Sequence, residues 1–112
     1  MSPEQVRNIV EDYPNLINKI QKAQNRLGRM SGKNPEQEMG ILEQLDAWER
    51  SFDFINRAID EEINISTREA FILDLRAHGH TYEQIGDMCY LSTERIRQIL
   101  NTTYKKMARE FS

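Results

Sequence analysis

The residues best suited to chemistry lie in the last third of the chain, in segment 92–109. Ile96 and Ile99 are spaced as neighbours on one face of a helix, and that face would turn inward. The outer face of the first two turns then carries only polar side chains, namely Thr93, Glu94, Arg97 and Gln98. Such a helix end is built to form directed hydrogen bonds with a ligand.

These side-chain types match the edges of nucleic-acid bases. Arginine can donate two hydrogen bonds to guanine, glutamine can pair with adenine, and glutamate can accept from the amine of cytosine. We therefore expect these four residues to read bases in the major groove. The DNA backbone would be held by the hydroxyls that begin two helices and by later cations, namely Thr81, Ser92, Lys105, Lys106 and Arg109. The alternative is a small helical domain whose polar face is merely solvated.

The elements that must position this face form a helix-turn-helix over residues 82–101. The motif needs apolar residues where its two helices meet, a small residue where they cross, and a cap on the second helix. Ile85 supplies the first, Gly86 the second and Ser92 the third. Tyr90 departs from the pattern, because a glycine or another small residue is common at that point of the turn.

The charge of the chain must be divided before it is used to judge nucleic-acid binding. The net charge is −3 and the sequence pI is about 5.4. Residues 1–65 hold 8 Lys/Arg against 12 Asp/Glu, whereas residues 92–112 hold 5 against 2. Exposed charges are screened beyond a Debye length of about 8 Å at physiological salt. The acidity elsewhere therefore permits a DNA-binding end and predicts that non-specific binding is weak.

The first half of the chain predicts a helical hairpin. Two helix starts are alike, Ser2-Pro3-Glu4-Gln5 and Asn34-Pro35-Glu36-Gln37, and a heptad series of apolar residues follows each of them. The short segment 31–35 would turn the chain back on itself. Pro14 should kink or split the first helix near Asp12. The seams are expected to bind each other, with a partner or a second copy as the alternative.

Together these patterns predict an all-α fold with two parts. Residues 1–64 would form the hairpin, which supports the fold, dimerises or binds a partner. Residues 65–112 would form a three-helix DNA-binding domain, opened by a capping box at Ser66 and a helix bearing Ala70, Phe71, Ile72 and Leu75 on one side. Trp48 and Phe52 would fill the core between the two parts or dock a partner.

Catalytic and metal sites are not expected. His78, His80 and Cys89 are too few for a strong metal site, and Cys89 is the single cysteine. The triplet Asp60-Glu61-Glu62 is best explained as solvated charge, and the chain shows no phosphate-binding loop. We therefore expect no enzyme activity and no cofactor. With no signal peptide and no apolar run of membrane-spanning length, we expect a cytoplasmic protein.

The segment HTYEQIGDMCYLSTERIRQILNTTYKKMARE resembles region 4 of bacterial primary sigma factors, and ERIRQI (residues 94–99) matches very closely. The preceding TREAFILDLRAHG resembles the helix before it. The resemblance covers about 45 residues. It implies that Glu94 and Gln98 read bases of a promoter element and that Arg95 or Arg97 contacts the backbone or a neighbouring protein. Thr93 stands where the family commonly has arginine, which removes one base-reading guanidinium.

The chain as a whole is closer to the small sigma-like regulators of phages and prophages of the ArpU and RinA type. The resemblance rests on the early acidic stretch EDYPN (residues 11–15), a loop, and a helix that leads into the region 4-like end. It implies activation of late phage genes in a bacterial host, with promoter DNA and RNA polymerase as partners. A homodimer is also expected to be possible. The alternatives are a small terminase-like packaging protein and a module that binds RNA polymerase or a sigma factor without touching DNA.

Overall fold

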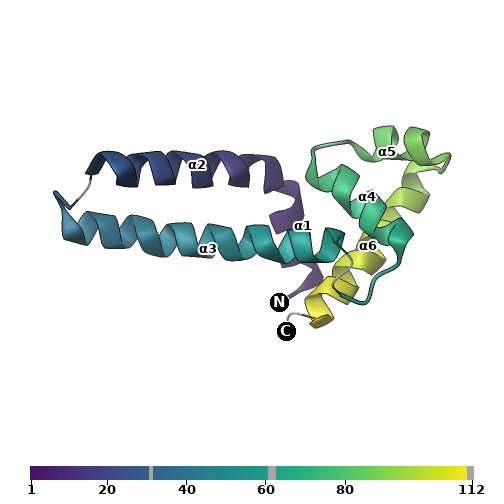
Figure 1. Ribbon diagram of the computed structural model, residues 1–112. Coiled ribbons are helices and arrows are strands. Elements are labelled where there is room, and N and C mark those ends of the chain that lie inside the picture. The colour runs from purple at the N-terminus through teal and green to yellow at the C-terminus, as the bar shows by residue number, and fades with distance from the viewer. Residues whose placement is uncertain (31, 61–62, 111–112) are drawn as a thin grey trace.

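The computed structural model describes residues 1–30, 32–60 and 63–110, and every regular element in this part of the chain is a helix. Six helices follow one another in the order α1 (Pro3–Glu11), α2 (Tyr13–Met30), α3 (Pro35–Ile59), α4 (Thr67–Ala77), α5 (Tyr82–Cys89) and α6 (Thr93–Glu110). The long helices α2 and α3 form an antiparallel arm, and the other helices gather at one end of it as a head (Figure 1). The molecule is elongated, measuring 54 × 28 × 21 Å. The predicted all-α class is confirmed.

The helix starts are those that the sequence predicts. Ser2, Ser66 and Thr81 each form a full capping box, in which the side chain accepts from the backbone N–H three residues later and that residue's side chain reaches back. Asn34 caps α3 by accepting from the N–H of Gln37 at 3.3 Å. These caps satisfy backbone donors that the first turn leaves without helical partners.

Pro14 splits the first helical segment, which is one of the two outcomes, a kink or a split, that the sequence left open. The chain leaves α1 at Asp12, and Tyr13 begins α2, so Pro14 falls in a first turn, where its missing N–H leaves no helical bond unmade. The break lets α1 turn away from the arm and pack against α4 and α6. Val6 and Val10 are fully buried there. A single heptad seam through α1 and α2 is therefore the wrong description, because α1 packs into the core of the head.

One hydrophobic cluster runs from α1 through the base of the arm to α6. Tyr13 stacks on Phe52 at a ring distance of 5.5 Å where the arm joins the head. Trp48 and Phe52 are both half-buried, and both pack against this cluster. That they fill the core between the two parts of the chain stays a prediction. In α4 the inward position belongs to Leu73, while Phe71 is 55% exposed, which corrects the prediction for Phe71. The division of the chain at residues 64 and 65 stays a prediction.

Candidate nucleic-acid interface

The turn between α5 and α6 is set by a close approach of two backbone segments. A Cβ atom on Gly86 would lie 2.6 Å from the carbonyl oxygen of Leu91, so only glycine fits this position. The N–H of Leu91 donates to the carbonyl of Gly86 at 2.9 Å and closes the turn. Tyr90 stands between them in the left-handed conformation, with φ of 56°. This backbone explains why a small residue is common there, since a side chain is strained in this region.

The second helix of the motif begins immediately after this turn. The hydroxyl of Ser92 accepts a hydrogen bond from the N–H of Arg95 at 3.1 Å and caps α6 as predicted. Ile96 and Leu100 are fully buried, and Ile99 is nearly so. The buried stripe fixes the rotation of α6 about its axis and turns the opposite side to solvent.

The four predicted base-reading residues, Thr93, Glu94, Arg97 and Gln98, are all exposed on this side of α6. Two of them are paired with each other, and one of these two also faces α5. The guanidinium of Arg97 pairs with Glu94 at 2.7 Å and lies 5.8 Å from the ring centroid of Tyr82. Arg95 donates to Gln98 at 3.5 Å. The face therefore presents acceptors and donors in a defined arrangement.

Asn101 belongs to this face and was missed in the sequence reasoning. It is exposed and stands three residues after Gln98 and four before Lys105, which places all three on one side of α6. Asparagine can form two hydrogen bonds with adenine. The i, i+3, i+7 spacing of exposed polar residues was the signal that would have found it.

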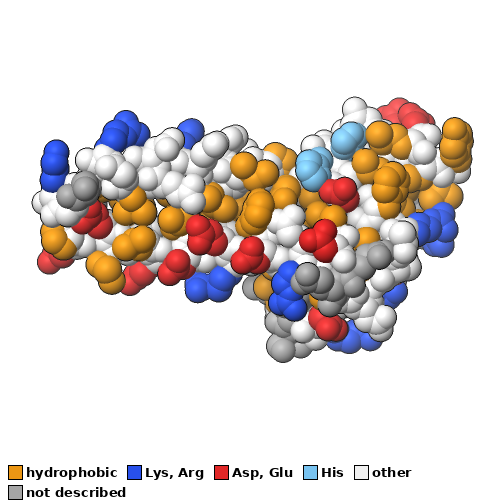
Figure 2. Space-filling view, viewed as in Figure 1, with side chains coloured by type: hydrophobic (Ala, Val, Ile, Leu, Met, Phe, Trp, Pro, Cys, Tyr) orange, Lys and Arg blue, Asp and Glu red, His pale blue; other side chains and the backbone are white. Residues whose placement is uncertain are grey.

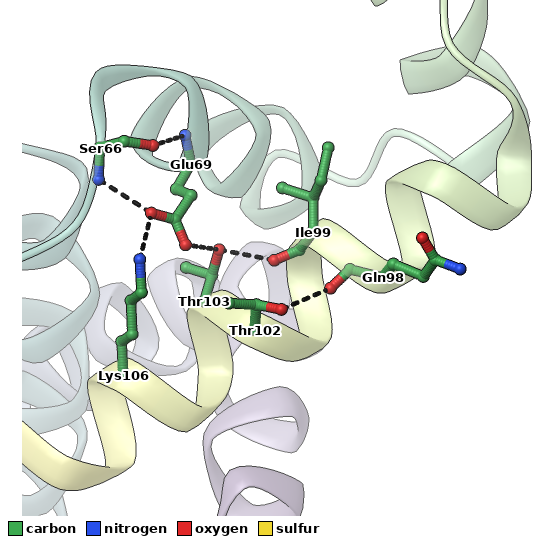
Figure 3. Close-up of polar contacts among 7 residues, drawn as sticks. All are labelled: Ser66, Glu69, Gln98, Ile99, Thr102, Thr103 and Lys106. Atoms are coloured by element: carbon green, nitrogen blue, oxygen red, sulfur yellow. Dashed lines mark hydrogen bonds and ion pairs between the residues drawn. The ribbon is translucent and has the colours of Figure 1, made fainter.

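The basic half of α6 carries three cations that differ in exposure. Lys105 and Arg109 are exposed. Lys106 instead reaches back to α4, where its ammonium lies 2.8 Å from Oε1 of Glu69 (Figure 3). Lys106 therefore has a structural partner, and its predicted phosphate contact would have to form beside this ion pair.

Glu69 is the centre of a polar network that ties α6 to α4. The N–H of Ser66 donates to Oε1 at 3.0 Å, and the Thr103 hydroxyl lies 3.3 Å from Oε2 and 2.8 Å from the carbonyl of Ile99 (Figure 3). Burial by itself raises the pKa of Glu69, but the hydrogen bonds from Lys106 and Ser66 outweigh burial, so the pKa of Glu69 lies below its ordinary value. The charged carboxylate thus ties α6 to α4 within the head.

Arg76 forms a second anchor that the sequence reasoning missed. Its guanidinium donates to the carbonyl of His80 at 2.9 Å and to Glu11 of α1 at 3.2 Å, and it lies 4.7 Å from the centre of the Tyr82 ring. One side chain thereby joins α1, α4 and the start of α5.

The hydroxyl of Thr81, which caps α5, still has its own hydrogen to donate to a phosphate oxygen, since capping uses it only as an acceptor.

The histidines lie at the end of α4. Nδ1 of His78 lies 3.0 Å from Oδ1 of Asp74, and Nδ1 of His80 lies 3.0 Å from the carbonyl oxygen of Leu75. Within the described ranges, no three His, Cys, Asp or Glu side chains are grouped so that they could hold a metal ion. Residues 61 and 62 of the acidic triplet lie outside the described residues.

None of the helices described is long and apolar enough to cross a membrane.

Residues 64–109 match the family model described as Sigma-70, region 4. This segment is a sigma-70 region 4-like domain. The region 4-like domain contains α4, α5 and α6, and so includes the capped turn and the exposed polar face. The match indicates DNA-binding transcription regulation of the sigma-like type, with DNA and RNA polymerase as the general interaction partners of such domains.

No curated protein and no solved structure shows a significant match to the chain. The N-terminal arm therefore has no counterpart among these comparisons. The resemblance to regulators of the ArpU and RinA type stays a prediction.

Proposed function

We propose that the chain regulates transcription by inserting α6 into the major groove of promoter DNA. The observation that supports this proposal most strongly is the face of α6 itself. It is held by a tight capped turn, is polar along its first two turns and becomes basic further on. Base-reading groups followed by phosphate-binding groups are what a recognition helix requires.

Each exposed residue then has a role that its chemistry allows. Arg97 donates to guanine, Gln98 and Asn101 pair with adenine, and Glu94 accepts from cytosine. Thr93 contacts a neighbouring base or methyl group. The phosphates are bound by hydroxyl and cationic groups at the start of α5 and along α6, namely Thr81, Ser92, Arg95, Lys105 and Arg109. Lys106 contributes a weaker contact beside its ion pair with Glu69. The ion pair between Glu94 and Arg97 orients both side chains before DNA arrives.

The partners follow from the small number of phosphate contacts. Affinity for DNA rises with the number of phosphates that a protein neutralises, and this domain offers few cations. We propose that co-binding with bacterial RNA polymerase, or pairing of two chains, supplies the remaining affinity. In this proposal the chain is a phage or prophage activator of late genes. It acts in the cytoplasm of the host cell as a binding protein and not as an enzyme.

Selection of bound fragments from host and prophage DNA at physiological salt tests the proposal. Wild type is compared with the double variant Arg97→Ala, Gln98→Ala. A matched control, Gln24→Ala with Arg29→Ala, removes the same two side-chain types from the arm. We expect wild type and control to enrich one promoter-proximal site and the α6 variant to lose it. Equal enrichment by all three proteins would refute the role of α6.

Two further measurements separate the alternatives. Transcription of the selected fragment by the host polymerase should rise when the chain is added, whereas a fall would indicate repression. The mass of the chain in solution should be that of a monomer or dimer, whereas a ring of many subunits would favour a packaging protein. If Arg97→Ala leaves transcription unchanged, a module that binds only the polymerase is the better explanation.

A further inference from the structure

The arm carries a groove that the region 4-like domain does not use. It lies between α2 and α3 in the part of the arm remote from the head, and its volume is about 560 Å³. Ala23, Ile41 and Trp48 form an apolar floor, of which only Ala23 is buried. Gly40 leaves the floor open, since a Cβ atom there would meet nothing within 4 Å. Apolar surface that two packed helices leave half-covered is suited to a third helix.

The charge of the groove has one sign. Helix α2 contains four Lys/Arg and no Asp/Glu, whereas helix α3 contains six Asp/Glu and two Lys/Arg. Figure 2 shows the basic side chains along one edge of the arm and the acidic side chains along the other. Among the described residues, three cations line the groove, Lys19, Lys22 and Arg26, and no carboxylate does. The α3 wall contributes the amides of Gln37 and Gln44 instead.

The acidic residues of α3 point to another side of the arm. Glu49 stands five residues after Gln44, which turns it about 140° around the helix. Glu49 and Asp53 line a separate hollow together with Ile17 and Phe52. The groove with the basic rim is therefore not neutralised by the acidic helix that forms its other wall.

Two of the three cations are available to a ligand. Lys19 is paired with Asp12 at 3.1 Å. Lys22 and Arg26 make no hydrogen bond or ion pair with any residue that the structure describes. They stand four residues apart, one helical turn, so two carboxylates spaced by one turn on a bound helix would meet both.

We propose that this groove binds an acidic amphipathic helix of a partner protein. Apolar side chains at i, i+3 or i+4, and i+7 would enter the floor beside Trp48, and flanking carboxylates would pair with Lys22 and Arg26. From residue 19 to residue 26 α2 rises about 10 Å, which accommodates two turns of such a helix.

The same charges disfavour a second copy of the chain as the occupant. Two copies joined groove to groove would place cations against cations. A copy that used its own acidic side would make a contact between unlike surfaces, which produces open chains of molecules and not a closed dimer. Double-stranded DNA is also a poorer occupant, because Ile41 and Ala23 offer nothing to a phosphate.

Trp48 gives a direct measurement of binding, because it is the single tryptophan of the chain. The probe is a 14-residue peptide with Leu at the i, i+3, i+7 positions and Glu on the flanks, titrated at physiological salt. Its counterpart with Lys in place of Glu serves as the peptide control. We expect a saturable blue shift of the emission with the Glu peptide alone.

The variant Lys22→Gln, Arg26→Gln should weaken that binding at least tenfold. The control Arg29→Gln, Lys33→Gln removes the same charge from the arm outside the groove and should change the dissociation constant less than threefold. Circular dichroism melts of both variants establish that they are folded. The proposal is overturned if the Glu peptide causes no shift, or if both variants bind equally. It is also overturned if duplex DNA causes the same shift with a lower dissociation constant than the Glu peptide. A further contradicting result is that wild type self-associates and the groove variant does not.

Discussion

Substitution of Gly86 by alanine tests the geometry of the turn that aims α6. The added Cβ would lie 2.6 Å from the carbonyl oxygen of Leu91, about 0.8 Å inside the 3.4 Å at which ordinary contact begins. Because that oxygen is backbone, the turn itself must move, and overpacking of this kind costs about 1–3 kcal/mol. The hydrogen bond from Leu91 to Gly86 would be distorted as well, which adds about 1 kcal/mol. The better helix propensity of alanine returns about 1 kcal/mol. We expect a net loss of about 2 kcal/mol.

Urea unfolding followed by circular dichroism measures this loss. In a thermal melt of a chain of this length, the same loss should lower the melting temperature by roughly 8 °C. The matched control is Gly28→Ala in α2, where an added Cβ meets nothing within 4 Å and the same propensity effect should stabilise the chain by up to about 1 kcal/mol. If Gly86→Ala is as stable as wild type, the close approach of α5 and the turn is refuted.

Three further outcomes are expected. Tyr90→Gly should stabilise the chain by about 0.5–1 kcal/mol in urea unfolding, because glycine accepts the φ of 56° and the lost side chain is 95% exposed; a loss of stability would contradict the left-handed turn. Glu69 should make stability depend on pH: its folded pKa is lowered, so its contribution is complete above the ordinary value of 4.5 and is lost as the pH falls through the folded pKa. Melts across this range should show a weaker dependence in Glu69→Gln. Lys105→Ala should weaken DNA binding for all sequences alike and reduce the slope of log K against log salt by about 0.9, whereas a loss confined to one sequence would assign Lys105 to base reading.

Local patterns in the sequence predicted most of the elements. Capping depends on side chains three residues apart, so Ser66 and Thr81 could be recognised without any tertiary information. The steric demand at Gly86 followed from the motif. The place of α1 could not be predicted in this way. Val6 fits a heptad seam as well as it fits a core of three helices, and only the break at Asp12 decides between them.

The outward face of α6 was predictable from a local pattern, as the helix caps were. The spacing of Ile96 and Ile99 identifies the buried stripe, and the exposed face lies opposite it. The partners of its charged residues were not. Lys106 reads as a free cation in the sequence, yet Glu69 of α4 binds it from 37 positions away. Arg76 had no role in the sequence analysis, yet it joins three elements. Such pairings depend on how the helices pack.

The central claim is that α6 reads base edges in the major groove. The most direct test is selection of bound sequences from a random duplex library by wild type and by the single variants Arg97→Ala and Gln98→Ala. If the claim holds, wild type selects a defined motif, and each variant loses preference at one or two neighbouring positions while the rest of the motif persists. If both variants select the unchanged wild-type motif, these side chains read no base, and the account of this face is wrong.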